Sequence, residues 1–425
     1  MSRTLITLIA LCVLTGAGNC QSQNSDANQS DTVKALMNEV DQLKARLVAL
    51  EAKQSQTTPA AQPEAAATPT PEVAVTPAPV YAAQPQSLEF KGIKFQGFGE
   101  VGWRANDNHA GQSQVFGFSE GPNGNFATGD FDLFLTSRIN DKTLVLSEIV
   151  FEAADAQSFD VNLARMLLIY DWNDYFKISL GRYHTSTSYY NEVFHSGAWL
   201  QTLVQRPLAV QFASQGGILP TQAIGASITG KVPSGKLGLN YIFEYGTSDT
   251  IRPDINSRVG DVTDESNGNG TTAGLFIKPD WAPGLDVGGS FYHDRINPTD
   301  TGFDIGQSII SAHAVYTTPK FEFLNEGFLV QHKVNGLRTF NTPAFYSLIS
   351  DNVAGKWRPY FMYQYANANA TRVVLDDVGL RHGPTAGVRY DFNAYVGFKV
   401  QYDHTFRRTP LPSINSVETQ VAFRF

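Results

Sequence analysis

The side chains most able to do chemistry in this 425-residue chain are its eight histidines and its serines, and their spacing fits no reaction. Ser227 lies in GASITG, which is not the G-x-S-x-G turn that exposes a nucleophilic serine. His184 and His195 are eleven residues apart, with no Cys or carboxylate at the spacing of a metal site. The sequence therefore predicts no catalytic residue, no metal and no other cofactor, and the protein is expected not to be an enzyme.

A second group of polar side chains lies in one long segment, HTSTSYYNEVFHSGAWLQTLVQRPLAVQFASQGG, residues 184–217. The segment is rich in aromatic residues and poor in the flexible polar residues of a solvated loop. A loop this apolar must pack on other parts of the protein. The polar and aromatic groups that it would then present to a binding or transport site are His184, Tyr189, Tyr190, Glu192, His195 and Arg206.

The elements around this segment are predicted to be β-strands. LGLNYIFEYG, TAGVRYDF, AYVGFKVQYDH and the ending VETQVAFRF each place apolar residues on one face and small or polar residues on the other. About sixteen such strands can be placed, and generally longer loops alternate with short turns: Asn140–Lys142, Asp171–Asp174, Pro233–Lys236, Asp280–Gly284, Thr318–Lys320, Gly355–Lys356 and Asp391–Ala394. All short turns then fall at one end of the fold. This predicts an all-β protein, a transmembrane antiparallel β-barrel over residues 88–425, whose closure leaves no strand edge in lipid.

The first twenty residues have the pattern of a secretory signal peptide. Arg3 precedes the apolar run LITLIALCVLTG, which is too short to span a bilayer, and cleavage is expected near Cys20. A lipoprotein with Cys20 as its acylated residue is the alternative, which Asn19 disfavours because a lipobox needs a small residue there. The only cysteines are Cys12 and Cys20, so no disulfide is expected in the mature protein.

Two further regions precede the predicted barrel. Residues 32–51, TVKALMNEVDQLKARLVALE, carry apolar residues at alternating spacings of three and four, which predicts a short coiled-coil helix and oligomerisation. A lone amphipathic helix is the alternative, although a segment this short is marginal by itself in water. Residues 52–87 are rich in Pro and Ala, which predicts an extended linker.

Composition excludes two other classes of protein. After the signal segment no apolar run reaches the length of a membrane-spanning helix. The formal net charge of -8 disfavours a protein that binds nucleic acid.

The order of these regions resembles that of Gram-negative outer-membrane porins: a signal peptide, a coiled coil, a linker and a barrel of about sixteen strands, the last of which ends on Phe425. The resemblance is to the phosphate-selective porin O and P type and to DcaP-like porins with an N-terminal coiled coil. It implies a cell outer membrane location among outer-membrane lipid, with the coiled coil in the periplasm, and a homotrimer held by coiled coil and barrel wall. It also implies that the barrel-assembly machinery recognises Phe425 and Phe423. In such porins the third loop, here 184–217, folds into the pore; a lid packed on neighbouring loops or subunits is the alternative.

Strand alternation places charged side chains on the lumen side of the predicted barrel. The pore-lining candidates are Glu148, Arg165, Arg182, Arg358, Arg389, Lys399 and Asp403, with Asp132 as a further one. Mixed charge across a lumen creates a field that selects polar solutes, whereas the alternative is that these groups only pair with one another in the wall.

The function expected from the sequence is passive diffusion of small hydrophilic solutes or ions through a water-filled pore narrowed by residues 184–217. The alternative is a structural or binding barrel that tethers the envelope layers and whose pore is plugged by the same loop. The sequence predicts neither the solute nor the sign of ion selectivity.

Overall fold

A computed structural model describes residues 88–90, 92–107, 124–153, 159–212, 217–247, 269–296, 304–368, 375, 378–408 and 410–425. The chain divides into two units, residues 1–73 and 74–425, and the described residues all belong to the second. The expected signal peptide, coiled coil and linker, residues 1–20, 32–51 and 52–87, lie outside the described residues and stay predictions.

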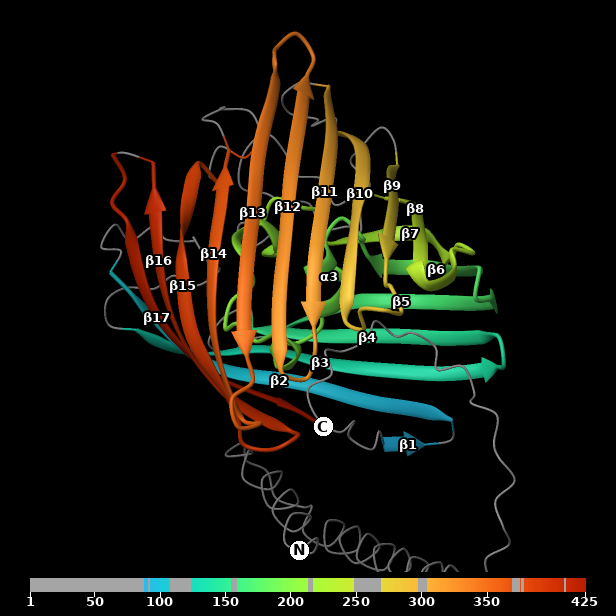
Figure 1. The fold of residues 1–425 in the computed structure, drawn as a ribbon, viewed down its shortest axis with the longest axis horizontal. Coiled ribbons are helices and arrows are strands. Elements are labelled where there is room, and N and C mark those ends of the chain that lie inside the picture. The colour runs from blue at the N-terminus through green and yellow to red at the C-terminus, as the bar shows by residue number, and fades with distance from the viewer. Residues whose placement is uncertain are drawn as a thin grey trace, which may run out of the picture. The chain divides into compact units, whose positions relative to one another are not determined.

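Sixteen strands, counted over the described residues, form one antiparallel sheet that closes on itself (Figure 1). Each strand pairs with the next along the chain, and β17 pairs back with β2. Their bounds are β2 (Ile93–Asn106), β3 (Asn125–Asn140), β4 (Thr143–Ala153), β5 (Phe159–Asn173), β6 (Phe176–His184), β7 (Gln222–Lys231), β8 (Leu239–Gly246), β9 (Gly270–Ile277), β10 (Leu285–Ile296), β11 (Ile305–Thr317), β12 (Phe321–Val334), β13 (Thr339–Asp351), β14 (Trp357–Asn367), β15 (Leu380–Asp391), β16 (Val396–Arg407) and β17 (Ile414–Arg424). A short strand, β1 (Leu88–Phe90), pairs with the start of β2. The predicted sixteen-strand barrel is confirmed.

The seven predicted short turns are also confirmed. They connect β3 to β4, β5 to β6, β7 to β8, β9 to β10, β11 to β12, β13 to β14 and β15 to β16, and therefore all lie at one end of the barrel. A single turn of 3-10 helix, η5 (Gly235–Leu237), lies in the third of them. Among the residues that the structure describes, no helix is long and apolar enough to cross a membrane.

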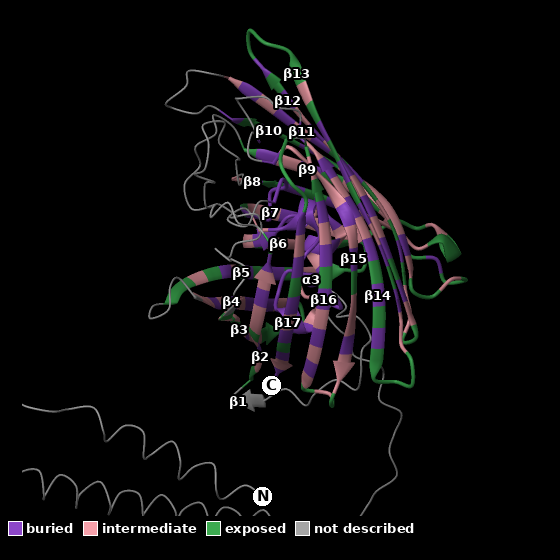
Figure 2. Ribbon diagram, turned by 90° about the vertical axis from the view of Figure 1, so that its left-hand side faces the viewer, coloured by how far each residue is buried: buried purple, intermediate pink, exposed green. Residues whose placement is uncertain are grey.

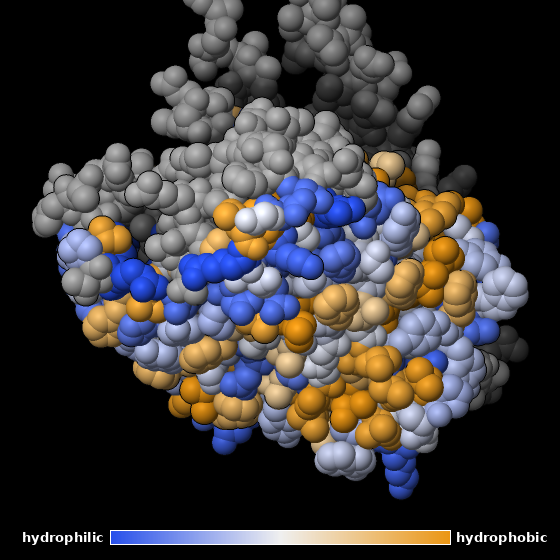
Figure 3. Space-filling model, turned by 90° about the horizontal axis from the view of Figure 1, so that it is seen from above, coloured by the Kyte–Doolittle hydropathy of each residue, from blue (hydrophilic) through white to orange (hydrophobic). Residues whose placement is uncertain are grey.

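The two faces of each strand differ as the alternation predicts. Along β17, Val417 and Val421 are exposed on the outer face, whereas Glu418 and Arg424 are buried on the inner face. Figure 2 shows this alternation as bands of buried and exposed residues along the strands. In Figure 3 apolar side chains gather in a broad patch on the outside. The exposed apolar residues of the outer face include Leu163, Leu168, Leu180, Leu275, Phe291, Ile310, Phe345, Ile349 and Phe361.

The seam where β17 meets β2 is packed by aromatic rings over glycines. Phe425 exchanges two backbone hydrogen bonds of 3.0 Å with Gly97, and its ring lies directly over that glycine. The ring of Phe423 covers Gly99 in the same way. Phe425 also stacks on Phe131 of β3, with ring centroids 5.8 Å apart. Only a residue without Cβ leaves room for these rings against the strand.

Replacing Gly97 with valine is expected to weaken the seam, because the new Cβ collides with the Phe425 ring. The displaced ring loses its contacts with β2 and Phe131, at a cost of about 1–3 kcal/mol. Heat-dependent migration of the folded barrel in SDS gels measures the effect as a lower unfolding temperature. Gly327→Val on β12 is the matched control, since a Cβ there meets nothing within 4 Å. Equal behaviour of the two variants contradicts the role given to the seam.

Candidate functional site

The connection between β6 and β7, described over residues 185–212 and 217–221, lies against the inner face of the barrel; these residues are called the inward loop below. Its described residues form a helix, α3 (Tyr189–Phe194), and the 3-10 turns η2 (Ala198–Leu200) and η3 (Leu208–Val210). Ser188 begins α3, because its hydroxyl accepts a hydrogen bond from Asn191 N. Both Figure 1 and Figure 2 place α3 among the surrounding strands.

Apolar side chains of the inward loop form a core with the barrel wall. Tyr190, Phe194 and Leu203 of the loop are almost fully buried against one part of the inner face. The wall residues of this cluster include Ile309, Leu324, Phe328, Val330, Tyr346, Leu348 and Met362, which lie on β11 to β14. Each such side chain contributes about 1.5–3 kcal/mol on burial, so the loop is held as firmly as a domain core.

Glu326 of β12 is the acceptor that holds the start of α3. Its carboxylate accepts hydrogen bonds from Ser188 Oγ at 3.1 Å, Tyr189 N at 2.7 Å and Tyr190 N at 2.9 Å. Tyr346 OH donates a fourth, at 2.5 Å. The backbone N–H groups that open a helix have no partner inside it, so the carboxylate satisfies them from the wall.

Lys399 and Arg389, two of the predicted pore-lining residues, hold the tip of the inward loop. Lys399 Nζ donates to the carbonyl oxygens of Ala198 and Leu203, at 2.6 and 2.8 Å. Arg389 Nη1 donates to those of Trp199 and Gln201, at 2.6 and 2.9 Å. Both side chains are almost fully buried, with at most 1% of their surface exposed. Their donors therefore serve the loop backbone.

Trp199 at this tip spans the barrel seam from the inside. It clusters with Phe98 of β2, Phe134 of β3 and Ala422 of β17. The guanidinium carbons of Arg389 and Arg424 lie 4.5 and 5.1 Å from its ring centroid. The loop tip and the outer aromatic rings thus pack on opposite faces of the same strand pair.

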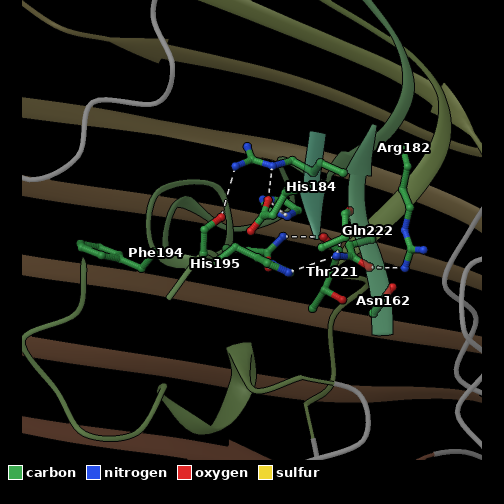
Figure 4. Close-up of polar contacts among 12 residues, drawn as sticks. Asn162, Arg182, His184, Phe194, His195, Thr221 and Gln222 are labelled. Atoms are coloured by element: carbon green, nitrogen blue, oxygen red, sulfur yellow. Dashed lines mark hydrogen bonds and ion pairs between the residues drawn. The ribbon is translucent and has the colours of Figure 1, made fainter. Parts of the chain in front are cut away.

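The root of the inward loop is a cluster of histidines and amides (Figure 4). The rings of His184 and His195 stack with centroids 3.6 Å apart. His195 Nδ1 lies 2.9 Å from Asn191 Oδ1, and its Nε2 lies 3.2 Å from Gln222 Nε2. Burial lowers the pKa of His195 well below its usual range, and Arg206 lowers it further. The neutral ring fits these contacts, with Nδ1–H donating to Asn191 and Nε2 accepting from Gln222.

Three predicted arginines lie close to this root. Arg165 Nε donates to Glu148 Oε2 at 2.5 Å, and Arg182 Nη2 donates to Gln222 Oε1 at 2.7 Å. Arg206 Nε donates to Val210 O at 2.7 Å, and its guanidinium carbon lies 4.3 Å from the Phe212 ring centroid. Burial lowers the pKa of Arg206 to about 10, so it stays charged at neutral pH.

The remaining predicted residues are spread around the inner face. Arg358 lies 3.7 Å from Asp391, and Asp403 accepts hydrogen bonds from Thr385 and Gln401. Tyr189 is half-buried, with its ring centroid 5.4 Å from that of His313, and Glu192 is half-buried near Lys278. Within the described residues, no three His, Cys, Asp or Glu side chains are placed to hold a metal ion.

A cavity of about 110 Å³ lies between the inward loop and the wall formed by β2, β3 and β17. Of the predicted residues, only His195 and Arg206 line it. The other charged groups around it are Glu100, Arg104, Asp130 and Glu418. Arg104 and Glu418 form an ion pair at 3.0 Å. The structure thus brings two of the loop candidates to the cavity, and Arg389 and Lys399 anchor the loop.

Sequence reasoning did not single out Glu100, Asp130 or Glu326. Glu100 and Asp130 lie where β2 and β3 lose regular pairing between Gly99 and Val101, so alternation alone does not give their orientation. Glu326 lies in FEFLNEGFLV, where both strand faces carry apolar residues because the inner face packs on the loop. A carboxylate between the apolar inward residues Leu324 and Phe328 was the available signal, since a buried charge requires partners.

The sequence matches no protein-family model and no curated protein. The fold is similar to solved structures. The anion-selective porin from Comamonas acidovorans has a TM-score of 0.55 and 12% identity, over 78% of this chain and 99% of that one. The outer membrane channel DcaP of Acinetobacter baumannii has a TM-score of 0.54 and 10% sequence identity, and the match covers 80% of this chain and 99% of that one. The trimer form of OmpT, an outer membrane protein of Vibrio cholerae, has a TM-score of 0.51 and 14% sequence identity, and the match covers 78% of this chain and 99% of that one. The chain therefore has the closed sixteen-strand barrel fold of outer-membrane porins.

Proposed function

We propose that this protein is an outer-membrane porin through which small hydrophilic solutes or ions diffuse passively. The observation that carries the proposal is a closed barrel with an apolar outer face and a charged interior. Lipid solvates the outer face, and closure leaves no backbone group unpaired at a strand edge. The interior then offers water-soluble molecules a route past the hydrocarbon layer.

The inward loop narrows this route. Its apolar core fills the side of the lumen next to β11–β14, and its tip reaches β2 and β17. The cavity beside His195 and Arg206 is the space that the loop leaves open at this level. Solutes pass there, and the side chains around the cavity decide which ones pass most readily.

The assembly is a homotrimer in the cell outer membrane, joined by the barrel wall and by the coiled coil of residues 32–51 in the periplasm. The heptad spacing of that segment and the trimer form of the similar Vibrio cholerae barrel support this arrangement. The barrel-assembly machinery recognises β17 through Phe423 and Phe425. No enzymatic step is part of the proposed function.

A barrel plugged by its inward loop, with a structural or binding role in the envelope, is the second candidate. The firm packing of the loop against both sides of the lumen favours it. The two candidates differ in one measurable property, because only a porin conducts ions.

Purified protein added to planar lipid bilayers is expected to raise the conductance in discrete steps, grouped in threes. The reason is that each barrel of a trimer adds its own water-filled path. Heat-dependent gel migration first establishes that the barrels are folded. Folded protein that inserts without any conductance step contradicts the porin and supports the plugged barrel.

A further inference from the structure

Two carboxylates at the cavity that take part in no ion pair among the described residues lie on neighbouring strands. Glu100 of β2 and Asp130 of β3 both line the cavity, and they lie close enough for their charges to act on each other. Glu100 Oε2 also accepts from Ala198 N at 3.2 Å. Neither carboxylate has an ion-pair partner among the described residues. Two adjacent carboxylates titrate as a pair, and they keep at least one negative charge at neutral pH.

The positive groups at the cavity are already engaged. Arg104 is paired with Glu418 through contacts of 3.0 and 3.2 Å. Arg206 is 5% exposed, and it donates to Val210 O, Phe194 O and Asn191 Oδ1 of the loop. A passing anion therefore meets few free donors from these two arginines.

A third carboxylate adds to the same wall. Asp132 of β3 is 3% exposed, and its Oδ2 has no hydrogen-bond partner within the described part of the chain. Oδ2 faces Gly197 of the inward loop, and Gly197 lines the cavity. A buried carboxylate oxygen without a donor is costly, and a cation or an N–H donor beside it relieves that cost.

Carboxyl groups outnumber cationic side chains around the cavity. Three lining carboxylates, Glu100, Asp130 and Glu418, face two lining arginines. Beyond the lining, Asp132 and Glu152 add negative charge near Asp130, whereas Arg165 and Glu148 offset each other as an ion pair. Lys399 supplies one opposing charge near Glu100.

We propose that this passage selects small cations, including organic solutes that carry ammonium groups, with Glu100 and Asp130 as the residues that attract them. The inference rests on the proposed porin function and names its solute class. Ammonium N–H groups fit the carboxylate oxygens of the pair, and the carboxamides of Gln201, Gln205 and Gln211 line the cavity beside them. Carboxylate rings favour cations in channels for the same electrostatic reason.

The test is the reversal potential of the reconstituted protein across a tenfold KCl gradient, which gives the ratio of K⁺ to Cl⁻ permeability. The wild-type protein is expected to favour K⁺. Glu100→Gln and Asp130→Asn together leave the pair without charge and are expected to lower the ratio about tenfold, because one unit charge about 6 Å from a passing ion in a water-like medium favours K⁺ and disfavours Cl⁻ about threefold each. Each single variant leaves one carboxylate in place and is expected to lower the ratio less. Asp174→Asn is the control, because it removes the same charge at an exposed turn outside the lumen.

Two probes of similar length extend the test to organic solutes. Propane-1,3-diammonium is expected to enter protein-containing liposomes faster than malonate, and the double variant Glu100→Gln/Asp130→Asn is expected to reduce this difference. A conducting wild-type protein that favours Cl⁻, or carboxylate variants that match the wild type, overturns the inference and leaves the porin function standing. Folded protein without conductance overturns both.

Discussion

Replacing Glu326 with alanine is expected to release the start of α3 from the barrel wall and to raise the unit conductance. Four donors, from Ser188, Tyr189, Tyr190 and Tyr346, lose their common acceptor. Each buried donor left without a partner costs about 1–3 kcal/mol, so the docked loop loses at least ~3 kcal/mol. Hydrogen exchange of amides 186–194 and single-channel recording measure the two consequences.

Two variants show whether the effect comes from the lost acceptors. Glu326→Gln keeps one carbonyl oxygen and is expected to fall between wild type and alanine. Glu322→Ala removes a neighbouring inward carboxylate that accepts, among the residues with a described placement, from Thr202 and Ser350 only. Its effect on α3 is expected to be smaller, because neither donor belongs to the helix. If Glu326→Ala and Glu322→Ala give the same pattern of amide hydrogen exchange, Glu326 has no specific role in holding α3.

Replacing Trp199 with alanine is expected to loosen the seam between β17 and β2. The indole packs on Phe98, Phe134 and Ala422, and lies between Arg389 and Arg424. Truncation of a buried aromatic side chain lowers the free energy of unfolding by about 3–5 kcal/mol. The two arginines also lose their cation–π contact with the indole ring. Amide exchange is expected to rise in residues 93–106 and 414–424, with a lower unfolding temperature.

Phe194→Ala is the matched control for the seam. Phe194 is equally well buried in the inward loop, but it packs in the cluster with β11–β14. Its loss is expected to destabilise the loop without faster exchange in β17. If both variants raise exchange at the seam equally, Trp199 stabilises the loop in general and has no special effect on barrel closure.

Most of the barrel could be predicted from the sequence, because lipid and water impose opposite demands on its two faces. In VETQVAFRF every second residue except Thr419 is apolar, and Val417 and Val421 do lie outside while Glu418 and Arg424 lie inside. This pattern fixes the register of β17 against β16 and β2. The rule weakens where the inner face is also apolar, as for Leu324 and Val330 of β12, because those residues pack on the inward loop.

The candidate site was harder to predict, because alternation gives the direction of a side chain and not its partner. Arg389 and Lys399 do lie on the inner face, yet they donate to loop carbonyls of residues 190 and 201 positions earlier in the sequence. Asp130 lies at a β-bulge, where period-two reasoning fails. The aromatic content of residues 184–217 correctly indicated that the segment packs on other residues.

The pairing of Gly97 with Phe425 also bears on how fast the barrel folds. It joins the first and last strands of the barrel, so the contact of greatest sequence separation is the one that completes the hydrogen bonding of both. Such non-local contacts slow folding, because the entropy of ordering the intervening chain is lost before the contact forms. Opening the seam would expose two strand edges at once, and in lipid neither finds a replacement partner. We therefore expect slow assembly and a still slower return to the unfolded state, so that the barrel persists through kinetic stability.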